Sequence, residues 1–80
     1  MRLDKYLKVS RLIKRRTVAN EACDGQRVTV NGRPAKASYD VSVGDVLEIR
    51  FGQRLLKVEV LSLNEFAGKS DAGSMYREIV

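Results

Sequence analysis

The run Val28-Thr29-Val30-Asn31-Gly32 constrains the fold of this chain more than any other stretch. Valine alternates with threonine, as in a strand with one buried face, and Asn-Gly follows directly. Both central residues of a type I′ turn need a positive φ, which Asn-Gly adopts readily. The sequence therefore predicts a tight hairpin. Its second strand, residues 35–37, is expected to be short or at a sheet edge because Pro34 cannot donate a backbone hydrogen bond.

Two short amphipathic helices are predicted ahead of this hairpin. In residues 2–8 the apolar side chains share one helical stripe, and the pattern fails near Val9-Ser10, where we expect the helix to end. A second helix is predicted over residues 16–23, ended by Gly25 in the left-handed conformation. We expect this helix to bury Val18, Ala19, Ala22 and Cys23 and to expose Thr17, Asn20, Glu21 and Asp24.

Alternating residues in 47–51 and 56–60 predict two further strands, joined by a type II′ turn at Gly52-Gln53. Helices followed by strands indicate an α+β fold in one small domain, which we expect to span residues 1–62. Residues 63–80 are polar and contain glycine, so we expect a mobile C-terminal tail. A short docking segment within that tail would comprise Met75, Tyr76, Ile79 and Val80.

The positive charge of the chain is concentrated in its first half. Residues 1–36 contain ten Lys or Arg and three Asp or Glu, whereas residues 37–80 contain five Lys or Arg and seven Asp or Glu. The net charge of the whole chain is +5. This asymmetry points to a polyanion partner, although a solvated surface can also carry a run of charge. Cations at the start of the second helix interact unfavourably with its macrodipole and so lower stability. Residues that are unfavourable for stability are often kept for function. The candidate residues are Arg2, Lys5, Lys8, Arg11, Lys14, Arg15 and Arg16.

The residues that most catalytic and metal sites use are scarce in this sequence. There is no histidine, one cysteine and no G-x-S-x-G or P-loop pattern, so we expect no enzyme activity, no metal and no cofactor. Cys23 lies on an apolar helix face and is interpreted as a packed core thiol. No apolar run approaches the roughly 20 residues of a membrane span, and no secretory signal is recognisable. We expect a cytoplasmic protein that does not bind membranes.

Four segments together resemble the S-four RNA-binding domain, which is named after a small-subunit ribosomal protein. They are Arg2-Leu3-Asp4-Lys5 with Leu7, Lys14-Arg15-Arg16 with Ala19, Val28-Thr29-Val30-Asn31-Gly32, and Gly44-Asp45. The resemblance covers about residues 1–61. Without a second domain, the chain is similar to the stand-alone members, which are related to a heat-shock RNA-binding protein. The basic N-terminal run and the tail with Met75-Tyr76 most resemble a member from bacterial ribosome quality control.

The resemblance implies an α-L motif, in which two packed helices on a short, mainly antiparallel sheet are pressed to RNA. It implies a non-catalytic protein that binds rRNA of the large ribosomal subunit and the peptidyl-tRNA that the subunit still holds. There it would steady the tRNA while a quality-control elongation partner extends the stalled chain without a template. Arg2 and Arg16 match the RNA-contacting arginines of the family by motif position. We expect a monomer.

Two residues depart from the family pattern, one at each end of the second helix. Arg15 stands where many members have Ser or Thr as the helix cap. Gln26 stands where a glycine usually precedes the first strand, and Gly25 lies one place earlier. The conformation of both helix ends is therefore open.

Several alternatives also remain open. A general structured-RNA or ribosome-assembly protein would show the same basic surface, and a DNA-binding helix-turn-helix module would bind duplex DNA as well as RNA. A peripheral membrane helix would need a larger exposed apolar face than Leu3, Tyr6 and Leu7 offer. Tyr6 would stack on a base or pack in the core, and Asp4 is interpreted as an internal partner that holds an arginine in position.

Overall fold

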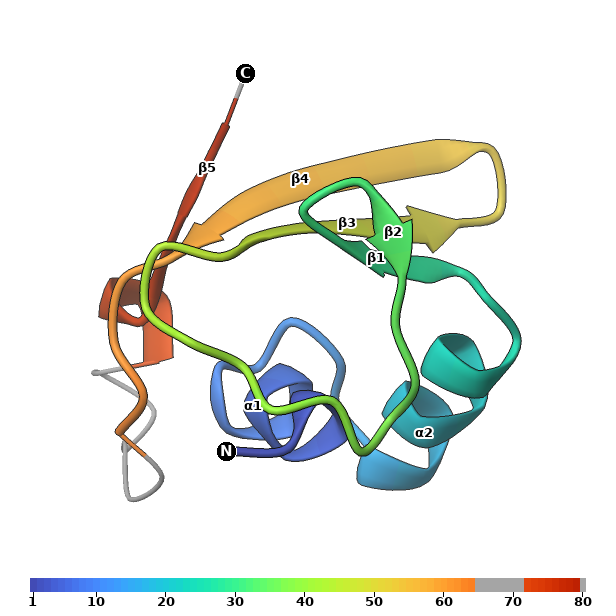
Figure 1. The fold of residues 1–80 in the computed structure, drawn as a ribbon, viewed down its shortest axis with the longest axis horizontal. Helices are drawn as coiled ribbons and strands as arrows, with labels where there is room; N and C mark the ends of the chain where they lie inside the picture. Colours follow the sequence, from blue (N-terminus) through green and yellow to red (C-terminus); the bar gives the residue numbers. More distant parts are fainter. Residues whose placement is uncertain (65–71, 80) are drawn as a thin grey trace.

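The computed structural model describes residues 1–64 and 72–79 of the 80-residue chain, and Figure 1 shows how they are arranged. The helices are α1 (Leu3–Val9), α2 (Arg16–Asp24) and the 3-10 helix η1 (Ala72–Ser74). The strands are β1 (Val28–Val30), β2 (Arg33–Pro34), β3 (Val46–Phe51), β4 (Arg54–Val60) and β5 (Tyr76–Glu78). They form one antiparallel sheet in the order β2-β1-β3-β4-β5.

Helices α1 and α2 pack against each other and lie together on one side of the sheet (Figure 1). Helix α1 ends at Val9, where the apolar stripe fails, and α2 begins at Arg16. The predicted α+β fold, with two packed helices on a short antiparallel sheet, is confirmed.

The hydrophobic core lies between the helical layer and the sheet. Leu3, Tyr6 and Leu7 of α1 are fully buried there. The hydroxyl of Tyr6 donates a 2.7 Å hydrogen bond to the backbone carbonyl oxygen of Met75. Tyr6 is thus a core residue with a satisfied hydroxyl, and α1 presents no apolar stripe to a membrane surface. None of the described helices is long and apolar enough to cross a bilayer.

Both predicted hairpin turns are confirmed by their backbone angles. Asn31 and Gly32 have φ values of 53° and 86°, as a type I′ turn requires. Gly52 has a φ of 60° whereas Gln53 does not have a positive φ, as in a type II′ turn. These turns fix the pairing of β1 with β2 and of β3 with β4.

The second arm of the first hairpin begins earlier than we expected. The two-residue turn pairs Val30 directly with Arg33, so β2 is Arg33–Pro34 and not residues 35–37. Ala35 and Ala37 lie outside the strand and bury their side chains in the core, although the backbone N–H of Ala35 still donates to the carbonyl oxygen of Val28 at 3.2 Å. The prediction that this arm is short and at an edge is confirmed, since β2 is the outermost strand beside β1.

The buried face of α2 is narrower than the sequence pattern indicated. Ala19, Ala22 and Cys23 are buried as predicted, but the side chain of Val18 is 47% exposed. Asn20, which was expected to face outward, is half-buried and bonds to α1. At 100° per residue, Val18 and Asn20 lie on either side of Ala19, at the two edges of the buried stripe.

The end of α2 also differs from the prediction. Gly25 has a φ of −83°, and the left-handed residue is Gln26, with a φ of 62°. The backbone N–H groups of Gln26 and Arg27 donate to the carbonyl oxygens of Cys23 and Ala22, which is a Schellman arrangement. Gly25 is needed for another reason: a Cβ there would lie 2.9 Å from the backbone oxygen of Glu21.

The C-terminal segment belongs to the fold where the structure describes it. We expected residues 63–80 to be a mobile tail, but β5 pairs with β4 in register and Met75 is 1% exposed. A strand of three residues is too short to show a sustained pattern, which is why β5 was not predicted. Residues 65–71 of the expected tail, and Val80 of the expected docking segment, lie outside the described residues.

Candidate nucleic-acid interface

A buried carboxylate, that of Asp4, joins the start of α1 to the start of α2. Its side chain is 3% exposed. Both nitrogens of the Arg2 fork donate to it, Nε at 3.1 Å and Nη2 at 3.4 Å. Arg16 reaches the same two oxygens through Nη2 and Nε, each at 3.4 Å. Asn20 Nδ2 at 3.3 Å and the backbone N–H of Lys5 at 2.8 Å complete the set of donors.

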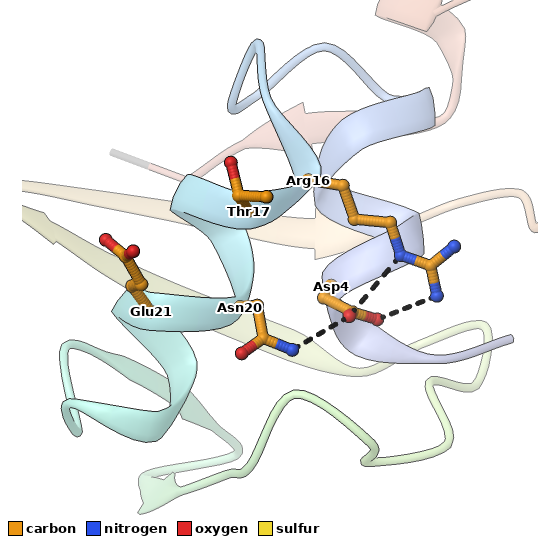
Figure 2. A pocket seen from close by; sticks show the side chains of 5 residues that line it. All are labelled: Asp4, Arg16, Thr17, Asn20 and Glu21. Carbon is orange, nitrogen blue, oxygen red and sulfur yellow. Dashed lines mark hydrogen bonds and ion pairs between the residues drawn. The ribbon is translucent and has the colours of Figure 1, made fainter.

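Local sequence explains why these groups meet. Asp4 lies in the first turn of α1, where a carboxylate is favoured by the helix dipole, and Arg2 directly precedes the helix in an extended conformation. Arg16 and Asn20 are four residues apart, so they project from successive turns of α2 (Figure 2). Figure 2 shows both side chains pointing toward Asp4 across the contact between the helices.

The loop after β2 closes the other side of this cluster. The backbone N–H groups of Leu3 and Asp4, at the start of α1, donate to the carbonyl oxygens of Tyr39 and Ala37. Arg2 forms an isolated β-bridge with Asp40. The backbone that carries Arg2 and Asp4 is therefore held by hydrogen bonds to this loop.

The charges of the cluster favour ionised Asp4. Burial opposes the charged form, but the hydrogen bonds from Arg2, Asn20, Arg16 and the Lys5 backbone together outweigh it, so the pKa of the carboxyl lies below its usual value. Asp4 is thus an anion at neutral pH.

Arg2 and Arg16 keep about half of their surface open to solvent, with side-chain exposures of 50% and 48%. One anion between two arginines leaves a net positive charge at this point. Because the contacts to Asp4 restrain each guanidinium, its remaining N–H groups are held ready for a second acceptor such as a phosphate. The interpretation of Asp4 as an internal partner for an arginine is confirmed, and it holds two of them.

A shallow open cleft of about 360 Å³ adjoins the cluster. Its lining comes from the first turn of α1 and the first two turns of α2 (Figure 2), namely Asp4, Arg16, Thr17, Asn20 and Glu21. One of the two held arginines, Arg16, belongs to this lining, together with the acidic side chains of Asp4 and Glu21.

Helix α2 forms although Arg15, and not a Ser or Thr, is its N-cap residue. Arg15 has the extended backbone of an N-cap residue, and within the described part of the chain its side chain makes no capping hydrogen bond. The helix nevertheless begins at Arg16, as the sequence predicted. Without a capping side chain, N–H groups of the first turn remain available to an anion.

The remaining candidate cations lie on α1 and on the connection to α2. Lys5 is half-buried on α1, and the exposed ones are Lys8, Arg11, Lys14 and Arg15. Arg11 follows the end of α1 with a φ of 62°, a conformation that costs a non-glycine residue about 1–2 kcal/mol. The structure brings Arg2 and Arg16 together at Asp4; RNA contact by all seven residues stays a prediction.

One member of the cluster was not predicted from the sequence. Asn20 was assigned to the solvent side of α2, but its amide donates to Asp4. The signal that could have found it is its spacing of four residues from Arg16, which places both on one face of the helix.

Other chemistry has little support in the described residues. No group of three or more His, Cys, Asp or Glu side chains that could hold a metal occurs within residues 1–64 and 72–79. Cys23 is 2% exposed, and burial, followed by the charges of Asp4 and Asp24, raises the pKa of its thiol to about 12. A thiol that stays protonated is a weak nucleophile, so the interpretation of Cys23 as a packed core residue is confirmed.

Comparisons with known proteins match both the sequence and the fold. The model of the S4 domain matches residues 1–47. The chain is 58% identical over 79 residues to the RQC P-site tRNA stabilizing factor of Streptococcus pneumoniae, covering 99% of this chain and 90% of that protein. It is 57% identical over 76 residues to the factor of that name from Bacillus subtilis, covering 95% and 88%. Among solved structures, the trimeric structure of Vibrio cholerae Heat Shock Protein 15 matches with a TM-score of 0.90 and 31% identity, covering 99% of this chain and 81% of that one.

Proposed function

This chain belongs to the S4 domain family, and on that premise we propose that it is a non-catalytic RNA-binding protein of ribosome quality control. In this proposal it binds rRNA of the large ribosomal subunit together with the peptidyl-tRNA on that subunit, and it stabilises the tRNA. The names of the relatives at 58% and 57% identity support the assignment, since both are P-site tRNA stabilizing factors.

The observation that carries the proposal is the pair of arginines held by Asp4. Both guanidinium groups bond to one buried carboxylate and both remain about half exposed. A surface arginine without such a partner has many rotamers, and ordering it on binding costs conformational entropy. Asp4 restrains Arg2 and Arg16 beforehand, which favours contact with phosphates at fixed positions.

The mode of recognition follows from the kinds of residues present. Arginine forks and lysines bind phosphate oxygens, and phosphate contacts set position and orientation without reading sequence. A double-stranded RNA stem offers its backbone and 2′-hydroxyl groups in a regular shape, whereas its deep major groove excludes side chains. We therefore propose recognition of a stem or stem-loop by shape, with little base reading.

The finer assignments are part of the same proposal. We propose that an elongation partner acts on the stalled subunit while this protein steadies the tRNA, and that both act in the cytoplasm. We also propose that the chain works as a monomer. The similar Heat Shock Protein 15 of Vibrio cholerae is trimeric in its solved structure, so light scattering across a range of protein concentrations is the measurement that decides this point.

Sedimentation with ribosomal subunits tests the proposal. Wild-type protein is expected to co-sediment with large subunits that carry peptidyl-tRNA, and Arg16→Ala is expected to remain in the supernatant. Arg77→Ala is the matched control, because it removes an arginine that is paired with Glu59 on β4. An Arg16→Ala protein that still co-sediments like wild type would defeat the assignment. Competition with duplex DNA in the same assay separates RNA binding from the helix-turn-helix alternative.

A further inference from the structure

A second cleft, of about 510 Å³, lies where the β1–β2 hairpin meets the loop that follows it. Its lining consists of Val30, Asn31, Arg33, Pro34, Ala35 and Tyr39. The volume is within the range of about 300–1,000 Å³ that small-ligand sites in proteins occupy. Among the lining residues there is one cation and no acid, so the cleft favours a ligand group with negative charge.

Arg33 lies on the side of the sheet that carries the helices. It pairs with Val30 across the hairpin, and directly opposed residues of an antiparallel pair project to the same face. Val30 belongs to the core and is 5% exposed, whereas Arg33, on the outermost strand β2, is exposed. Arg33 therefore brings its charge to the edge of the helical face.

Tyr39 lies on the same side of the sheet, in a loop whose backbone is held at both ends. Figure 1 shows the loop after β2 descending from the hairpin to the start of α1. The N–H of Tyr39 donates to the carbonyl oxygen of Lys36 at 3.0 Å, and its own carbonyl oxygen accepts from Leu3 at 2.8 Å. Ala37 and Val41 on either side are 2% exposed, but Tyr39 is 38% exposed. The loop thus holds an aromatic residue at the surface.

The side chains of Arg33 and Tyr39 have no partner in the described part of the protein. Within residues 1–64 and 72–79, no hydrogen bond satisfies the Tyr39 hydroxyl, and the Arg33 guanidinium makes neither an ion pair nor a side-chain hydrogen bond. An exposed aromatic ring beside a cation is what proteins use to stack an unpaired base and bind the adjoining phosphate. Both groups line one cleft, so one nucleotide can contact them together.

The path from this cleft to the Asp4 cluster is short. Leu3, whose N–H donates to Tyr39, directly follows Arg2, and Arg2 forms a β-bridge with Asp40. The backbone that carries Tyr39 is therefore hydrogen-bonded to the backbone that carries one of the two held arginines. An RNA strand that leaves a stem bound at Arg2 has only to pass this junction to reach the cleft.

We propose that the cleft lined by Arg33 and Tyr39, here called the Tyr39 cleft, binds one unpaired nucleotide of the RNA. The base stacks on Tyr39, and Arg33 binds the adjoining phosphate. The inference rests on the proposed function and deepens it, because it names the preferred RNA: a stem with an unpaired loop, and not a fully paired stem. Stacking accepts every base, so the preference is for an unpaired strand and not for a sequence.

Binding to two RNAs that share one stem tests this inference. The first RNA is a stem-loop with an unpaired loop, and the second is the blunt duplex of the same stem. Wild-type protein is expected to bind the stem-loop about five- to 150-fold more tightly, which is the contribution of one stacked base. Tyr39→Ala is expected to bind both RNAs equally, with its affinity for the duplex unchanged. Tyr39→Phe keeps the ring and should keep the preference.

Arg33→Gln tests the phosphate contact separately. For the stem-loop, the slope of the logarithm of the association constant against the logarithm of salt concentration should flatten by about 0.7, as for one phosphate of a single strand. For the duplex, the slope should not change. Arg54→Gln is the matched control, because it removes an exposed arginine beside the β3–β4 turn. It should leave both slopes at the wild-type value.

Phe51→Ala is the matched control for Tyr39→Ala, because it removes another partly exposed aromatic ring, on a residue that is 41% exposed. It should bind the stem-loop more tightly than the duplex by the wild-type factor. Circular dichroism and the affinity for the duplex verify that each variant is folded.

The outcomes separate this inference from the proposed function. If wild type binds neither RNA, or Arg16→Ala binds both unchanged, the proposed function fails. If binding needs Arg16 but wild type binds the stem-loop and the duplex equally, only the Tyr39 cleft is refuted. A Tyr39→Ala protein that keeps the wild-type preference also refutes a nucleotide at this cleft, and leaves a protein segment as its occupant.

Discussion

Asp4 and Arg16 are twelve residues apart in the sequence, and their side chains make two contacts of 3.4 Å across the junction of α1 and α2. The same carboxylate binds Arg2 through two further contacts. One buried acid therefore fixes the packing of the two helices and the direction of two half-exposed arginines. Fold stability and RNA binding should accordingly respond together when this carboxylate is changed.

Replacing Asp4 with asparagine keeps the size of the side chain and removes its charge. We expect Asp4→Asn to lower the free energy of unfolding by about 1–2 kcal/mol, because charge-assisted bonds are lost while solvent already screens the half-exposed arginines. RNA affinity should also fall, because Arg2 and Arg16 lose their anchor. Urea unfolding and an RNA titration measure the two effects. Glu78→Gln, which neutralises an exposed acid on β5, is the control and should change neither.

Acid should destabilise the wild type through the same residue. The pKa of Asp4 in the fold lies below its ordinary value of 3.8, so the stabilisation is complete above that value and is lost as the pH falls through the pKa of the folded state. Unfolding free energies measured from neutral pH down to below 3.8 should fall more steeply for wild type than for Asp4→Asn. Parallel curves for the two proteins would mean that Asp4 titrates normally.

Substitutions at two neighbouring positions at the end of α2 should change the free energy of unfolding in opposite directions. Gln26 has a left-handed backbone, so Gln26→Gly should raise the free energy of unfolding by about 0.5–1 kcal/mol after the greater flexibility of glycine in the unfolded chain is subtracted. Gly25→Ala should lower it, because the new Cβ would meet the backbone oxygen of Glu21 at 2.9 Å. Thermal unfolding of both variants checks this, and a destabilised Gln26→Gly protein would contradict a left-handed Gln26 at this helix end.

Arg11 should show a conflict between stability and binding. Its φ of 62° is strained for arginine, so Arg11→Gly should stabilise the fold by about 0.5–1 kcal/mol. If the side chain contacts RNA, the same variant should bind RNA more weakly. Arg11→Asn is the control, since asparagine tolerates this backbone and removes the charge without adding flexibility. An unchanged RNA affinity in both variants would remove Arg11 from the interface.

The local elements of the fold were predictable from the sequence because their signals lie within a few residues. Asn31-Gly32 and Gly52-Gln53 fix their own backbone angles, and the two helices follow from short apolar stripes. The predicted second strand of the first hairpin began two residues too late. In the structure Arg33 pairs with Val30 directly after the two-residue turn.

What the sequence could not show depends on contacts between distant residues. The role of Asn20 depends on its contact with Asp4, sixteen residues earlier, and the sequence near Asn20 does not indicate that contact. Met75 was predicted as part of a docking segment and is buried, but the strand that follows it, β5, is defined by its pairing with β4, which the sequence did not show. The left-handed backbone at position 26 favours glycine, but the residue there is Gln26. A prediction from residue preference therefore placed the left-handed residue at Gly25.

The salt dependence of RNA binding tests the central claim most directly. For wild type and a short RNA stem-loop, the logarithm of the association constant should fall with the logarithm of salt concentration at a slope of roughly −3.5 to −4.5, if five phosphates are neutralised. Arg16→Ala should flatten this slope by about one unit, whereas Arg77→Ala should leave it unchanged. Equal slopes for wild type and Arg16→Ala would contradict the claim that the arginines held by Asp4 bind the RNA backbone.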